Sequence, residues 1–99
     1  MNTLYEMLIP TQFNDGQSTA QEQVAFQNDC LKLAGGYTEL GQATGAWKSP
    51  DGHVYHDATI PFRVACDAAT AHHLAVDAKA LFKQEAVILY PVSSGVEFV

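Results

Sequence analysis

The chain has few cysteines, few basic residues and little charge overall, and each shortage excludes a class of protein. Its 99 residues include only two cysteines, Cys30 and Cys66, too few for a disulfide scaffold and too far apart for the paired ligands of a zinc site. Lys and Arg number 5 against 11 Asp and Glu, which gives a net charge of -6. Because clustered basic side chains attract phosphate, this balance argues against binding to a nucleic-acid backbone or an anionic membrane.

Long hydrophobic runs are also missing. No apolar segment approaches the roughly 20 residues that cross a bilayer, and no basic segment precedes the first apolar run, so we expect a cytoplasmic protein without membrane contact. Hydrophobic residues nevertheless make up 47% of the chain and charged residues 16%, so a core can form. We expect one domain over residues 1–99, with both cysteines as buried free thiols.

The first third of the chain predicts a strand followed by a helix. Residues 4–9 form a central strand by pattern, because apolar side chains occupy both of its faces. Thr19, followed three residues later by Glu22, has the form of a capping box that opens a helix over 20–34, and the glycine pair 35–36 stops it. Apolar residues cover about half the circumference of this helix: Val24, Phe26, Cys30, Leu31, Leu33 and Ala34.

The middle of the chain predicts a hairpin. A short strand over 37–40 and a flexible connection over 41–45 precede it. Two strand segments, 46–48 and 54–55, flank the sequence Ser-Pro-Asp-Gly-His at 49–53, whose proline and Asp-Gly pair are typical of a tight turn.

The second arm of the hairpin continues to Cys66, because apolar residues alternate along it: Ile60, Phe62, Val64 and Cys66. Pro61 cannot donate to a strand ladder, so we expect a bulge or interruption there. Asp67 or Thr70 caps a second helix with an apolar stripe: Ala71, Leu74, Ala75, Ala78, Leu81 and Phe82. The chain then predicts a strand over 86–90, a turn and a short last strand over 96–99.

This order of elements predicts an α+β domain with the ferredoxin-like βαββαβ fold: an antiparallel sheet, two helices on one face and an extra short C-terminal strand. The first and third strands are then central neighbours, so Glu6 and Arg63 are expected to pair on the face away from the helices. That face also carries Tyr55 and Asp57, together with the apolar or aromatic side chains of Leu4, Leu8 and Tyr90. Such a mixture favours cover by a partner or by a second copy of the chain.

Three segments carry a resemblance to a known group: Gly-Gly-Tyr-Thr at 35–38, GAWKSPDGHVYHD at 45–57 and EAVILYPVSSGVEFV at 85–99. With the element order, they resemble small bacterial and phage proteins of the ferredoxin-like, dimeric α+β barrel type. The resemblance implies a homodimer built from facing sheets. It implies no particular reaction, because that group includes monooxygenases, lyases and proteins that only bind ligands.

The residues best suited to chemistry are His53, His56 and Asp57, since imidazole and carboxylate groups transfer protons and bind zinc, nickel or iron. On an extended strand His56 and Asp57 point to opposite faces, so convergence on one metal needs a bulge or a second subunit. A structural role, proton transfer and a metal site remain open for this cluster. His73 and Asp77 are four apart on a helix, the spacing of an ordinary surface pair.

Other motifs are missing. The serines and cysteines lie in no activating context, and the glycine pair lacks the spacing of a nucleotide-binding loop, so we expect no cofactor or metal. Four aromatic residues either pack within the sheet or line a hydrophobic ligand pocket: Tyr37, Trp47, Tyr55 and Tyr90.

Two functions from different classes follow. The first is a homodimeric binding or regulatory protein that contacts a protein or a small ligand, such as a phage-encoded inhibitor whose acidic surface meets a basic host factor. The second is a small dimeric α+β barrel enzyme, monooxygenase- or lyase-like, whose catalytic residues are His56, Asp57, Arg63 and Tyr55. Asp57 and Arg63 lie about 20 Å apart along a regular strand, so they share one ligand only if the strand bends near Pro61. We favour the first function, because the predicted geometry brings no catalytic set together.

Overall fold

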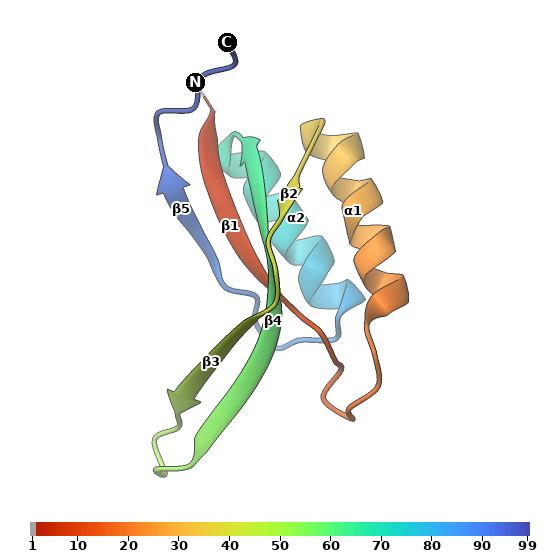
Figure 1. The fold of residues 1–99 in the computed structure, drawn as a ribbon, viewed down its shortest axis with the longest axis vertical. Helices are drawn as coiled ribbons and strands as arrows, with labels where there is room; N and C mark the ends of the chain where they lie inside the picture. Colours follow the sequence, from red (N-terminus) through yellow and green to blue (C-terminus); the bar gives the residue numbers. More distant parts are fainter. Residues whose placement is uncertain (1) are drawn as a thin grey trace.

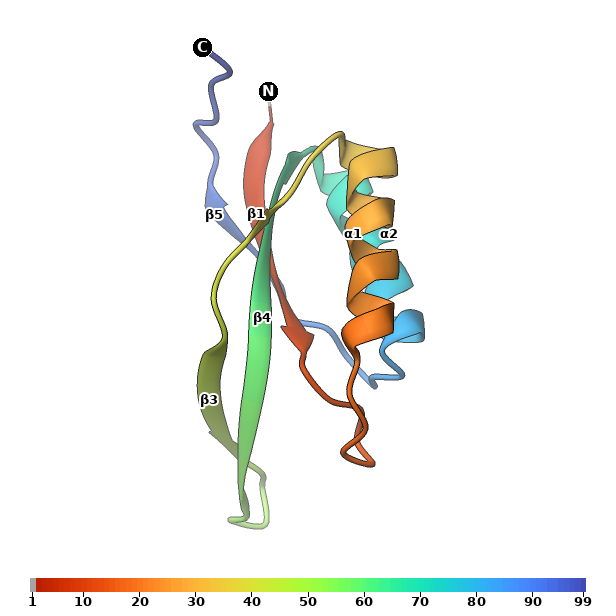
Figure 2. The same ribbon diagram turned by 45° about the vertical axis from the view of Figure 1, so that its right-hand side comes forward.

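Two helices cover one face of an antiparallel sheet, and no other layer of the described residues covers its second face (Figure 1, Figure 2). The computed structural model describes residues 2–99. The elements are β1 (Thr3–Pro10), α1 (Ala20–Ala34), β2 (Thr38–Glu39), β3 (Ala43–Lys48), β4 (Val54–Cys66), α2 (Ala68–Leu81) and β5 (Leu89–Ser93). The strand order is β2-β4-β1-β5, with β3 also paired to β4. This arrangement confirms the ferredoxin-like α+β fold, with β1 and the long β4 as central neighbours.

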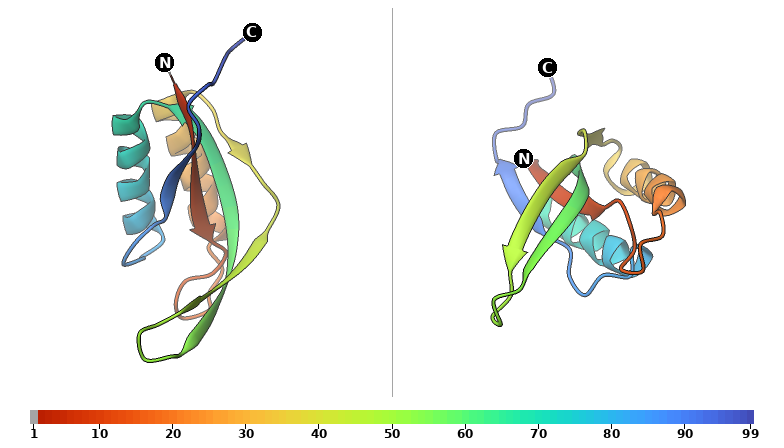
Figure 3. Two further views of the ribbon diagram at one scale, coloured as in Figure 1. Left: turned by 90° about the vertical axis from the view of Figure 1, so that its left-hand side faces the viewer. Right: turned by 60° about the horizontal axis from the view of Figure 1, so that its bottom comes forward.

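The 13-residue strand β4 organises the sheet. One edge pairs with β1 over residues 59–66, and the opposite edge pairs first with β3 and then with β2. The β3-β4 hairpin therefore extends beyond the two helices, at the opposite end of the molecule from both termini (Figure 3). The predicted turn at 49–53 is confirmed, and β3 begins at Ala43, three residues earlier than expected.

Pro61 does not interrupt β4, contrary to the prediction. It pairs with Leu8 in an unbroken register against β1, and its carbonyl accepts a hydrogen bond from the backbone N–H of Leu40 at 2.9 Å. In an antiparallel pair the N–H and C=O of one residue point to the same side. The N–H that Pro61 lacks would therefore lie on the edge of β4 where the pairing partner changes from β3 to β2. The pairing is interrupted on that edge, between β3 and β2, while β4 itself continues.

The core lies between the sheet and the helices, and aromatic rings hold its centre. Phe26 of α1 meets Phe62 of β4 edge to face at 5.1 Å and Phe82 at 6.0 Å, and all three side chains are fully buried. Cys30 and Cys66 are buried and free, as expected. Burial raises the pKa of the Cys30 thiol to about 12, so this side chain behaves as a small apolar group.

The start of α1 departs from the expected capping box. Thr19 is buried, and its hydroxyl donates to the carbonyl of Pro10 at 2.7 Å and accepts from the side-chain amide of Gln23 at 3.0 Å. The hydroxyl thus ties the helix to the end of β1, and no side-chain cap forms. The end is as predicted, because Gly35 takes the left-handed conformation with φ at 81° and closes the last turn.

The apolar surface of α1 is narrower than the sequence indicated. Phe26 and Cys30 are fully buried, whereas Val24 and Leu31 are more than half exposed, because the sheet and α2 cover only one side of the helix. Helix α2 matches its prediction. The Asp67 carboxylate accepts from the backbone N–H of Thr70 at 2.7 Å, and four members of the apolar stripe are fully buried: Ala71, Leu74, Ala78 and Phe82.

The C-terminal region also differs from the prediction. The last strand is β5, which begins three residues later than expected and includes Pro91, and residues 96–99 form no strand in the described structure. Ser93 already pairs with Leu4, one residue from the start of β1. Beyond Ser93 the chain therefore has almost no neighbouring strand left to pair with. In the described residues, no helix is long and apolar enough to span a bilayer.

Candidate functional site

A recess of about 620 Å³ lies where the hairpin meets two connecting segments. We call it the hairpin recess. Its walls come from the end of β1 and the loop behind it, from both hairpin strands, and from the linker between α2 and β5. The lining residues are 8, 10–14, 43–47, 56–59, 84 and 86–88.

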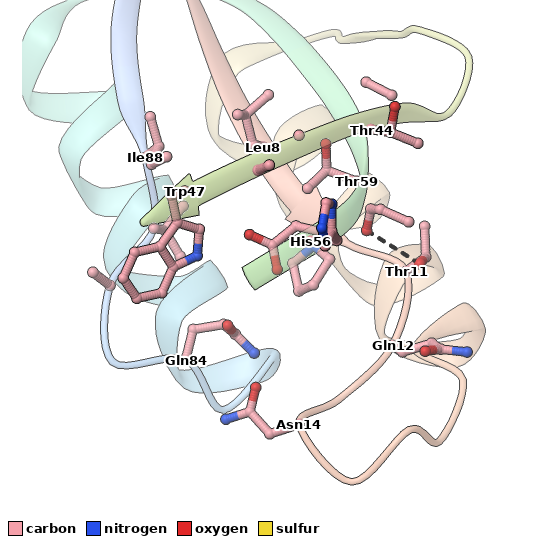
Figure 4. A pocket seen from close by; sticks show the side chains of 18 of the residues that line it. Leu8, Thr11, Gln12, Asn14, Thr44, Trp47, His56, Thr59, Gln84 and Ile88 are labelled. Carbon is pink, nitrogen blue, oxygen red and sulfur yellow. Dashed lines mark hydrogen bonds between the residues drawn. The ribbon is translucent and has the colours of Figure 1, made fainter. Parts of the chain in front are cut away.

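Two polar connections lie on the far side of the recess from the hairpin. Figure 4 shows His56 and Trp47 on the hairpin, with Gln84 of the linker and Asn14 of the loop opposite them. The loop is held in place by Thr11, whose backbone N–H and hydroxyl both donate to the carbonyl of Ala58, at 3.1 and 3.2 Å. The recess is thus bounded by regular strands on one side and by anchored connections on the other.

Aromatic side chains stack on the hairpin beside the recess. Trp47 lies against Tyr55 with ring centroids 4.7 Å apart and planes 19° from parallel, and the edge of His53 meets Tyr55 at 4.3 Å. In the turn, the Asp51 carboxylate accepts from the Ser49 hydroxyl and from the backbone N–H of His53, and these bonds lower the pKa of Asp51. The turn and the stack together hold Trp47 in position, although 53% of Trp47 remains exposed.

The structure brings His56 and Asp57 to the same recess. Alternation along a strand sends their side chains to opposite faces, so the sequence predicted that they would not converge. However, β1 pairs with β4 only from Thr59 onward. His56 and Asp57 therefore lie on a length of β4 whose β1-side edge is open, and both border the recess.

Arg63 and Tyr55, the other two predicted site residues, lie elsewhere. Arg63 pairs with Glu6 on the helix-free face, as expected, and its Nε donates to Oε1 of Glu6 at 2.8 Å. The Glu6 side chain is 9% exposed and the Arg63 side chain 37%, so this ion pair is partly buried, with its carboxylate in the body of the sheet. Tyr55 stacks on Trp47 and does not line the recess.

The remaining histidines are not gathered into a metal centre. His73 lies 3.5 Å from Asp77 on the surface of α2, as the spacing predicted, and His53 belongs to the hairpin turn. Within residues 2–99 no group of three or more His, Cys, Asp or Glu side chains is placed to hold a metal ion.

The charge of the recess is one-sided. Among the described residues that line the recess, Asp57 is the only one with a carboxylate, and none is Lys or Arg. The other polar groups of the lining are imidazole, amide and hydroxyl groups. The sequence did not indicate a site role for Thr11, Asn14 or Gln84, because no local pattern shows which loops the fold brings together. This lining offers hydrogen bonds and an aromatic face. The Lys83 ammonium lies just outside it, 5.4 Å from the ring centroid of the lining residue Phe13.

Comparison with known proteins identifies the fold and no family. No family model matches the chain, and a search of curated proteins finds no match. Several solved structures are similar. The divalent cation tolerance protein CutA1 from Thermus thermophilus has a TM-score of 0.68 at 15% identity, covering 97% of this chain and 88% of that chain. The periplasmic divalent cation tolerance protein CutA from Archaeoglobus fulgidus has a TM-score of 0.63 at 11% identity, with coverages of 98% and 89%.

A third similar structure is a phage SAM lyase in complex with S-methyl-5'-thioadenosine. Its TM-score is 0.70 at 14% identity, and the match covers 96% of this chain and 83% of that chain. Identities this low establish shared architecture only. The class that the comparisons define is therefore the small ferredoxin-like α+β protein. Membership of the dimeric α+β barrel group and a cytoplasmic location remain predictions.

Proposed function

We propose that this chain is a self-associating protein that binds a small nucleoside-type ligand in the hairpin recess. The observation that carries the proposal is the recess itself, which joins the exposed indole of Trp47 to polar groups from three separate segments. Its volume of about 620 Å³ falls within the range of small-molecule sites. A nucleoside combines a planar ring with hydroxyl groups, which suits an aromatic wall and a polar floor.

The fold comparison supports this choice of ligand without establishing it. The phage SAM lyase has the same architecture and was solved with a thioether nucleoside bound. S-methyl-5'-thioadenosine is therefore the first ligand to test on this chain. Because Trp47 is the only tryptophan, its fluorescence reports directly on the recess.

A fluorescence titration with S-methyl-5'-thioadenosine tests the proposal. Saturable quenching is expected with the wild-type protein, and His56→Ala should weaken binding at least tenfold while the melting temperature changes little, since His56 is exposed. His73→Ala on α2 is the matched control and should bind as the wild type does. Equal affinity of all three proteins, or no saturable binding, would remove the proposal.

Self-association through the helix-free face is the second part of the proposal. That face carries the Glu6–Arg63 pair together with Leu4, Leu8 and Tyr90, so a partly buried charge pair sits among apolar side chains that no other element of residues 2–99 covers. A homodimer with facing sheets would remove this apolar area from water. Sedimentation equilibrium should give about twice the 10.7 kDa chain mass, and Tyr90→Lys should shift the protein toward the monomer. A wild-type monomer at micromolar concentration would contradict this part.

A lyase acting on S-adenosylmethionine is the second candidate function, and the phage SAM lyase fold is the observation that favours it. In this version His56 and Asp57 are the candidate proton-transfer groups, because both border the recess. Arg63 and Tyr55 would support the sheet and the hairpin. Incubation with S-adenosylmethionine, followed by mass spectrometry for S-methyl-5'-thioadenosine, tests this version, with Asp57→Asn as the inactive comparison. Product formation at the rate of the protein-free control would exclude it.

A further inference from the structure

Gly45 leaves an open space on the hairpin, although its backbone conformation does not require a glycine. The residue lies in the middle of β3, and its φ is outside the left-handed region that favours glycine. A Cβ placed on Gly45 would meet no atom within 4 Å. Glycine weakens a strand and often marks a place where another group approaches the backbone closely. Neither the backbone nor crowding explains Gly45, which points to the open space above it.

The walls of this space carry an aromatic face and a carboxylate. Gly45 pairs directly with Asp57 across the hairpin, so Asp57 has no cross-strand side chain opposite it. Trp47 lies two residues along β3, on the same face of the strand, and its ring stacks on Tyr55. Gly45, Trp47 and Asp57 all border the hairpin recess. We call the open space above Gly45, between these residues, the Gly45 notch.

The chemistry of the notch selects a positive charge. An indole face attracts cations through its quadrupole, and a carboxylate attracts them directly. No Lys or Arg of the described lining competes for Asp57, and the chain as a whole carries a net charge of -6. A phosphate in the same place would face an unopposed carboxylate.

We propose that the Gly45 notch receives a positively charged organic group of the ligand, an ammonium or sulfonium centre, held between the Trp47 indole and the Asp57 carboxylate. This inference rests on the proposed ligand-binding function and adds to it a preference for cationic nucleosides over neutral ones. Nucleotides, whose phosphates carry the opposite charge, are then poor ligands for the recess.

Two ligands that differ by one methyl group and one charge test the inference. S-adenosylmethionine carries a sulfonium, and S-adenosylhomocysteine has a neutral thioether at the same atom. Titration followed by Trp47 fluorescence and by calorimetry should show the sulfonium ligand binding about tenfold more tightly, as expected for a cation beside an aromatic face and a carboxylate. Asp57→Asn should reduce this preference to about threefold or less.

Gly45→Val tests the notch as a space. Valine favours strands and meets no neighbour here, so the melting temperature should stay equal or rise, while binding of S-adenosylmethionine should fall at least tenfold. Gly41→Val is the matched control, because Gly41 has equal room and lies outside the recess. It should leave binding unchanged.

The outcomes separate this inference from the proposed function. Equal affinity for the two ligands, with His56→Ala still weakening both, would overturn the charge preference and leave the ligand-binding proposal intact. Full binding by Gly45→Val would overturn the notch. If neither nucleoside binds to the wild-type protein, both the inference and the proposed function fail.

Discussion

Replacement of Phe62 by alanine should be among the most damaging changes in this chain. Its side chain is 0% exposed, and it lies on the inner face of β4 between Phe26, at a centroid distance of 5.1 Å, and Tyr37, at 5.7 Å. Removing a buried phenylalanine costs about 3–5 kcal/mol through lost burial and the cavity that remains. The edge-to-face contact with Phe26 adds to this loss, so we expect a value in the upper half of that range.

Urea unfolding followed by circular dichroism measures the effect of Phe62→Ala. For a domain of this size, about 4 kcal/mol should lower the midpoint by about 2 M or leave the variant unfolded in buffer. Phe98→Ala provides a control with the same chemical change, because Phe98 is 78% exposed, and it should cost about 0.5 kcal/mol or less. Comparable losses in the two variants would refute the assignment of the inner face.

Three other predictions concern charged and ionisable groups. Arg63→Met leaves the buried Glu6 carboxylate without its partner, so urea unfolding should show a loss of about 1–3 kcal/mol, partly restored by adding Glu6→Gln; no loss would contradict the pairing of Arg63 with a buried carboxylate. Hydrogen bonds from Thr70 lower the pKa of Asp67, so the stability that the Asp67 carboxylate contributes is present above its unfolded pKa near 4 and is lost as pH falls. The melting temperature of Asp67→Ala should therefore be lower than that of the wild type at pH 7 and equal to it at pH 2. Burial raises the pKa of Cys30 to about 12, so the free energy of unfolding should fall as pH rises from about 9 toward 12, and rapid reaction of Cys30 with a thiol reagent in the native protein at pH 8 would contradict its burial.

Local signals predicted most of the fold correctly. The Asp67 cap, the left-handed Gly35 and the Pro-Asp-Gly turn at 49–53 each act within a few residues, and the structure confirms all three. Alternation along β4 correctly separated the buried Phe62 from Arg63 on the helix-free face. The same alternation, with the element order, placed Glu6 opposite Arg63.

Features that depend on distant partners were predicted less well. Thr19 has the sequence of a cap, but its hydroxyl bonds to Pro10, a contact that no local pattern encodes. Residues 96–99 have the composition of a strand and lack a strand to pair with, because Ser93 already lies opposite Leu4, one residue from the start of β1. Pro61 predicted a break in the strand. In the fold, the N–H that it lacks would lie on the edge of β4 where the pairing partner changes from β3 to β2, so β4 continues through it.

The candidate site was predictable only in its hairpin half. His56 and Asp57 stood out by residue type, and Trp47 was one of four aromatic candidates for a pocket wall. Asn14 and Gln84 reach the same recess from segments about 70 residues apart in the sequence, and Gly45 contributes by lacking a side chain. Hydrophobic periodicity and capping motifs do not predict contacts between distant loops, because those contacts depend on which loops the fold brings together.

Backbone amide chemical shifts measured during titration with S-methyl-5'-thioadenosine test the central claim most directly, because they locate the ligand on the chain. The largest shifts are expected in residues 11–14, 43–47, 56–59 and 84–88, which line the hairpin recess. Shifts confined to the helix-free face around Glu6, Arg63 and Tyr90, or spread over α1 and α2, would contradict the account.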